Sequence, residues 1–108
     1  MDYQKNKDLV EELLSCSATC DYCAMACLDE KDFEKMRNCI KTNLICAELC
    51  RTTATAIVKG LAPAENLLKE CIKACQKCAV ECSNHTHQHC KDCASACEKC
   101  AESCKKAL

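Results

Sequence analysis

Cysteine and other apolar residues recur along this chain in steps of three and four, with charged residues between them. Such steps return to one face of an α-helix, whereas a half-buried strand would alternate with a period of two. The pattern predicts helices over residues 7–28, 33–59, 63–83 and 88–106. Because the connections are short, consecutive helices should run antiparallel. We therefore expect an all-α fold, an antiparallel up-down four-helix bundle with residues 1–108 as a single domain.

Three residues between these segments are typical of helix ends. Asp32 is a candidate N-cap for the second helix, since a short acidic side chain can accept a hydrogen bond from a free backbone N–H. Gly60 suits the position just after that helix, where the backbone often turns left-handed. Pro63 suits the first turn of the third helix. These signals support the predicted boundaries.

The buried face of each predicted helix consists mainly of cysteine. The four runs are Cys16, Cys20, Cys23 and Cys27; Cys39, Cys46 and Cys50; Cys71, Cys75, Cys78 and Cys82; and Cys90, Cys93, Cys97, Cys100 and Cys104. Asn43 stands in the second run where the spacing would place another thiol. Four such lines facing one another would give a bundle with a Cys-lined core.

Composition and charge limit the classes of function that this chain could have. The 16 cysteines could act as small core residues, but a core of thiols alone would be undersized and would leave destabilising voids. The formal net charge of -1 gives no electrostatic footprint for nucleic acid. The chain has no apolar run long enough to cross a membrane, and its first residues lack a signal-peptide core. We expect a cytoplasmic protein that partners neither nucleic acid nor membrane.

Metal binding is a better explanation for these cysteines than disulfide bonds. Cytoplasmic thiols stay reduced. Within one helix, Cβ atoms three or four residues apart are separated by about 5–6 Å, whereas a disulfide needs about 3.5–4.5 Å. Bridges between helices remain open as an alternative.

The spacing and charge of the thiols favour Cu(I) among the soft metals. The bacterial iron–sulfur spacing C-x2-C-x2-C-x3-C is absent. Four thiolates around Zn²⁺ leave net negative charge, and several such sites in one dry core would be costly. One Cu(I) per thiolate leaves the core neutral, which favours multiple Cu(I) ions. A zinc or other soft-metal buffer and a thiol or iron–sulfur redox protein remain alternatives.

The two ends of the predicted bundle differ in chemistry. One end should be an aliphatic plug made of Leu9, Leu13, Thr53, Ile57, Leu61, Leu67, Leu68 and Leu108. The other end carries His85, His87, His89 and Met36, which with Asn43 are further candidate copper ligands. We therefore expect copper to enter at the histidine end.

The four cysteine runs, Asn43, and the segment His85-x-His87-x-His89-Cys90 resemble the bacterial copper storage proteins over about residues 10–105. The resemblance implies a bundle that holds many Cu(I) ions on cysteine, with an entrance near His, Met or Asn residues. It also implies a homotetramer and the cytosolic branch of the family. A copper chaperone, or an efflux donor or acceptor, would be a partner. No catalytic arrangement is visible, which favours storage over an enzyme.

Overall fold

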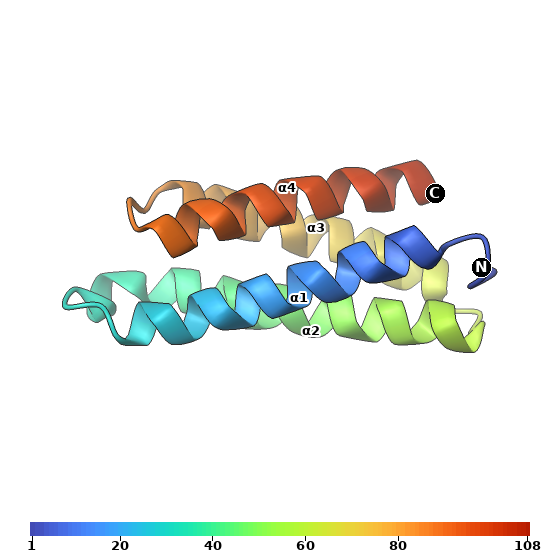
Figure 1. The fold of residues 1–108 in the computed structure, drawn as a ribbon, viewed down its shortest axis with the longest axis horizontal. Helices are drawn as coiled ribbons and strands as arrows, with labels where there is room; N and C mark the ends of the chain where they lie inside the picture. Colours follow the sequence, from blue (N-terminus) through green and yellow to red (C-terminus); the bar gives the residue numbers. More distant parts are fainter.

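Four long helices lie antiparallel in the computed structural model, which describes residues 1–108 (Figure 1). The helices are α1 (Lys7–Leu28), α2 (Arg37–Lys59), α3 (Ala64–Ser83) and α4 (Gln88–Ala107), with a short 3-10 helix η1 (Phe33–Met36) before α2. Figure 1 places both termini and the α2–α3 connection at one end, and the α1–α2 and α3–α4 connections at the other. The predicted up-down four-helix bundle is confirmed.

Each helix packs against two neighbours. Helix α1 packs against α2 and α4, and α3 packs against the same two helices. The diagonal pairs meet only through core side chains, such as Cys46 of α2 and Cys97 of α4. The bundle measures 44 × 19 × 18 Å, so its core is a long, narrow column between the four helices. Side chains from all four helices therefore meet along one axis.

The helix ends agree with the sequence signals in two of three places. Gly60 has a φ of 65° and ends α2, with the next N–H, that of Leu61, donating to the carbonyl of Ala56 at 2.9 Å. Pro63 directly precedes α3. The N-cap prediction for Asp32 is wrong, because Asp32 precedes η1 and makes no side-chain cap. Its carboxylate instead lies 3.3 Å from Nε2 of His87.

The aliphatic plug forms at the end that carries the termini, but it is smaller than predicted. Its buried members are Leu9, Leu13, Thr53, Ile57 and Leu68. Leu67 is only half-buried. Leu61 and Leu108 are 46% and 55% exposed, so their assignment to the plug is wrong. Leu61 follows the left-handed turn at Gly60, and Leu108 lies beyond the end of α4, so neither continues its helix face.

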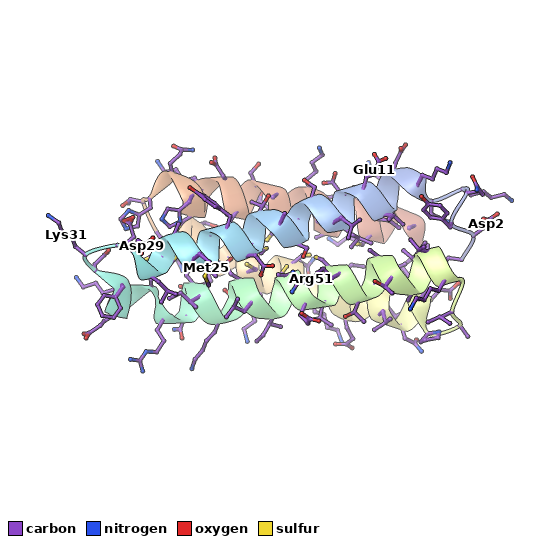
Figure 2. The ribbon with its side chains drawn as sticks, turned by 60° about the horizontal axis from the view of Figure 1, so that its bottom comes forward. Asp2, Glu11, Met25, Asp29, Lys31 and Arg51 are labelled. Atoms are coloured by element: carbon purple, nitrogen blue, oxygen red, sulfur yellow. The ribbon has the colours of Figure 1, made fainter.

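Polar side chains cover the outside of the bundle, and sulfur atoms lie between the helices (Figure 2). Figure 2 shows Lys31 at the tip of the α1–α2 connection and Asp2 at the opposite end. None of the helices combines the length and the apolar character needed to traverse a bilayer. The one chemically distinctive region is therefore the interior.

Candidate metal centre

All sixteen cysteines are buried and none forms a disulfide. The helical steps of three and four point every run inward, and the antiparallel packing sets thiols of adjacent helices side by side. The shortest Sγ–Sγ distances between helices are Cys20–Cys97, Cys39–Cys82 and Cys46–Cys75, each 3.5 Å, and Cys50–Cys71, 3.6 Å. A disulfide bond is about 2.05 Å long, so these pairs are separate thiols close enough to share one metal ion.

The thiols form overlapping groups rather than isolated sites. Within each group the Sγ atoms lie within 4.8 Å of one another, as in Cys16, Cys46, Cys50 and Cys75; Cys16, Cys20, Cys46 and Cys97; Cys20, Cys78, Cys93 and Cys97; Cys23, Cys27, Cys39 and Cys90; and Cys23, Cys82 and Cys93. Several cysteines belong to two groups. A thiolate shared between groups can bridge two ions, so the arrangement suits a continuous column of soft metal ions.

The end of the bundle formed by the α1–α2 and α3–α4 connections is called the connection end. Burial changes the pKa of the thiols at this end of the column. It raises the pKa of Cys27 and Cys90 well above the ordinary range, and the nearby Cys23 and Cys39 thiolates add repulsion. These groups are therefore neutral thiols in the metal-free fold near neutral pH. A metal ion that binds them must displace their protons.

The raised pKa values should make the metal-free protein less stable in alkali. An unfolded cysteine ionises near pH 8.5, whereas Cys27 and Cys90 hold their protons to higher pH in the fold. Above that pH the unfolded state binds fewer protons, so the free energy of unfolding should fall as pH rises. Urea denaturation of reduced apoprotein, at about pH 7 and about pH 10, measures this fall.

The copper-loaded protein is the control for this measurement, because its thiolates hold metal instead of protons. Its stability should vary much less over the same interval. A denaturation midpoint of the apoprotein that stays constant would contradict the raised pKa values.

Asn43 takes the place of a thiol in the column. It is fully buried, and its Oδ1 atom accepts hydrogen bonds from Cys78 and Cys93 at 3.0 Å and from Cys82 at 3.5 Å. Its Nδ2 atom donates to Sγ of Cys39 at 3.6 Å. Both polar atoms of the side chain are thus paired with thiols of the column, which explains how an amide is tolerated in this core. The side chain also places an oxygen atom within hydrogen-bond distance of three sulfur atoms.

Met36 is fully buried at the connection end, as expected, but in η1 rather than in α2. Met36 therefore packs into the core close to the expected entrance. By contrast, the side chains of Met25, Tyr22 and Leu44 are exposed on the surface.

The three histidines gather at the connection end, but they occupy different surroundings. Nε2 of His85 lies 2.8 Å from Oε2 of Glu81. His87 faces carboxylates through both ring nitrogens: Nδ1 is 2.7 Å from Oε2 of Glu30, and Nε2 is 3.3 Å from Oδ1 of Asp32. Neither ring contacts a thiol, since both rings turn toward acidic side chains.

His89 alone reaches the sulfur column. Its Nδ1 atom lies 3.3 Å from Sγ of Cys23 and 3.5 Å from Sγ of Cys90. The carboxylates of Glu30, Asp32 and Glu81 beside the histidines were missed by the sequence reasoning. Of these three residues, only Asp32 was singled out from the sequence, as an N-cap and not as a partner of a histidine.

The sequence profile of the copper storage protein family matches residues 2–108. The chain belongs to this family. The uncharacterized cysteine-rich protein YhjQ of Bacillus subtilis is 30% identical over 88 residues, which is 82% of each chain.

Solved structures of copper storage proteins share the fold. The Cu(I)-bound copper storage protein BsCsp3 superposes with a TM-score of 0.90 at 30% identity, over 94% of this chain and 95% of that one. A cytosolic copper storage protein from Streptomyces lividans, solved with five coppers, gives 0.89 at 34% identity, over 93% and 88%. This family member therefore shares its fold with copper storage proteins that were solved with bound copper.

Proposed function

We propose that this protein stores multiple Cu(I) ions on the thiolates in the core of its bundle, with the whole chain acting as one metal-binding domain. The observation that carries the proposal is the overlap of the buried thiol groups, which lets neighbouring ions share ligands. All sixteen cysteines are the proposed ligands. Asn43 and His89 face the same thiols, Met36 is a further candidate, and His85 and His87 are assigned to the entrance region.

Charge favours Cu(I) over Zn²⁺ in this column. Each Cu(I) that replaces a thiol proton leaves the charge of the core unchanged, whereas Zn²⁺ on four thiolates leaves two negative charges in a dry interior. No lysine or arginine is buried beside the thiols to offset such charge. Binding several Zn²⁺ ions in this core therefore has an electrostatic cost that binding Cu(I) does not have.

Storage also fits better than turnover. A redox or catalytic cysteine usually has surroundings that single it out from other thiols and an exposed face. Here every cysteine is buried among other cysteines. We therefore propose a binding protein and not an enzyme, with a thiol or iron–sulfur redox protein as the rival.

We further propose that the protein acts in the cytoplasm, as the Streptomyces lividans relative is described as cytosolic. A copper chaperone or an efflux system would exchange ions with it. A homotetramer would cover part of its exposed apolar surface, for which Leu44 is a candidate because it is large and exposed.

Metal competition tests the proposed function. Reduced apoprotein, mixed anaerobically with equal amounts of Cu(I) and Zn²⁺ and then desalted, should retain copper and little zinc. The bound copper should resist a bidentate Cu(I) chelator present in excess. The loaded protein should lack visible absorption, because Cu(I) has a filled d shell, whereas an iron–sulfur cluster is coloured. Preferential retention of zinc, or a coloured cluster in freshly isolated protein, would contradict copper storage.

A further inference from the structure

Each of the three histidines at the connection end has a different set of partners, and only one is set to meet an incoming ion. Both nitrogens of His87 face carboxylates, and His85 pairs with Glu81. Nδ1 of His89 lies beside Cys23 and Cys90, whose Sγ atoms are 4.0 Å apart. One imidazole nitrogen and two thiols thus form a compact triangle at the connection end of the sulfur column.

His89 is also within reach of solvent. Its side chain is 13% exposed, and it lines a surface hollow together with Ala18, Thr19, Tyr22 and Asp92. An ion arriving from this hollow would meet His89 before the deeper thiols. Which of its two ring nitrogens faces the thiols with a free lone pair therefore decides whether the first ligand is ready.

A neutral imidazole carries its proton on one nitrogen only, and the other nitrogen holds the lone pair that binds metal. For Nδ1 to face Cu(I), the proton of His89 must reside on Nε2. That Nε2 atom is buried and has no hydrogen-bond partner. The carboxylate oxygen that faces it is Oε1 of Glu30, at 3.6 Å.

Glu30 is itself held in place by the neighbouring ring. Its Oε2 atom lies 2.7 Å from Nδ1 of His87, and the rings of His87 and His89 stack at a centroid distance of 5.4 Å with planes only 3° apart. One carboxylate thus faces both rings and joins the α1–α2 connection to the start of α4. An N–H···O bond is about 2.9 Å long, so a movement of about 0.7 Å would bring Oε1 into contact with Nε2.

We propose that Glu30 is a positioning residue for copper uptake: its carboxylate keeps the proton of His89 on Nε2, so that Nδ1 stands ready beside Cys23 and Cys90 as the first copper ligand. Carboxylates orient metal-binding histidines in this way in many sites. The inference rests on the proposed copper storage. It assigns the acidic α1–α2 connection a role in the rate and affinity of first binding, and none in total capacity.

Imidazole ¹⁵N chemical shifts of the metal-free protein test the tautomer directly. In the native chain, Nε2 of His89 should show the shift of a protonated nitrogen and Nδ1 that of an unprotonated one. Glu30→Ala should move the two shifts toward each other. It should also weaken binding of the first Cu(I) equivalent about 10-fold, the lower end of the range for such partners. The final copper capacity should not change.

Four further variants separate positioning from other effects. Glu34→Ala removes an equal charge from an exposed residue of η1 at the same end, and it should leave shifts and affinity unchanged. Glu30→Asp keeps a carboxylate and should restore part of the affinity. Glu30→Gln keeps the size but offers only an uncharged amide oxygen as acceptor, so it should restore less than Glu30→Asp. In a His89→Ala background, Glu30→Ala should add no further loss.

Unchanged His89 shifts and unchanged first-equivalent affinity in Glu30→Ala would overturn the proposal. So would an equal loss of affinity in Glu34→Ala, which would mean that negative charge alone attracts the ion. Failure of the native protein to bind Cu(I) would instead refute copper storage, and the tautomer measurement on the metal-free protein would still be interpretable.

Discussion

Titration of the reduced, metal-free protein with Cu(I) should reach its end point at about 16 ions per chain, one for each cysteine. The physical reason is the sharing of thiolates between overlapping groups, which removes the need for four separate ligands per ion. An anaerobic titration followed by the absorbance of a weaker Cu(I) chelator measures the end point. Thiols counted on the same sample are the control, because an oxidised pair would lower the capacity without altering the sites.

A single substitution tests whether thiolates are shared between copper ions. Cys46 belongs to two groups and lies 3.5 Å from Cys75, so Cys46→Ser should lower the capacity by about one or two ions. It should leave the rest of the column filled. An end point near four ions in the native chain would indicate separate tetrahedral sites of four thiolates, and the shared column would be wrong.

Shortening one plug residue should destabilise the metal-free bundle strongly. Leu13 is fully buried, so Leu13→Ala should lower the free energy of unfolding by about 2–5 kcal/mol, through lost burial and the cavity left behind. Chemical denaturation of the reduced apoprotein, followed by far-UV circular dichroism, measures the change. The apoprotein should start out strongly helical, because the plug and the helix ends do not depend on metal.

Leu14 offers a matched control in the same helix. It is 48% exposed, so Leu14→Ala makes the same change in helix propensity with little loss of burial, and it should alter stability by no more than about 0.5 kcal/mol. Equal effects of the two substitutions would mean that the plug does not hold the apo bundle together. An apoprotein without helix would refute the plug as the metal-independent core.

The periodicity of the sequence predicts the helices and their inward faces well, because both depend on local geometry. The predicted range 7–28 is that of α1, and the sixteen cysteines point inward because each run keeps helical spacing. The second helix differs at its start, where Phe33–Met36 forms a 3-10 turn. Over four residues its period of about 3.0 residues is too close to the α-helical period of about 3.6 to be distinguished. The start of that turn therefore could not be told from α-helix by spacing alone.

The details of the entrance could not be predicted, because they depend on two connections that meet only in the folded bundle. Nothing in the spacing of His85, His87 and His89 tells which ring reaches the thiols. In the fold, His87 pairs with Glu30 and Asp32, more than fifty residues earlier in the chain, and His89 lies beside the thiols. Leu61 and Leu108 failed as plug residues for a related reason, since each lies outside the helix whose face it was expected to extend.

The plug has a consequence for the order in which a filled store would empty. Leu13, Ile57 and Leu68 close the bundle beside the deep end of the thiol column, whereas His89 lies at its open end. An ion held near Cys71 or Cys104 can reach the histidine end only past the sites around Cys23 and Cys90. If copper enters and leaves at the histidine end, as proposed, the ions bound last would be released first, and a partner would draw on recently stored copper while the oldest ions stay in reserve.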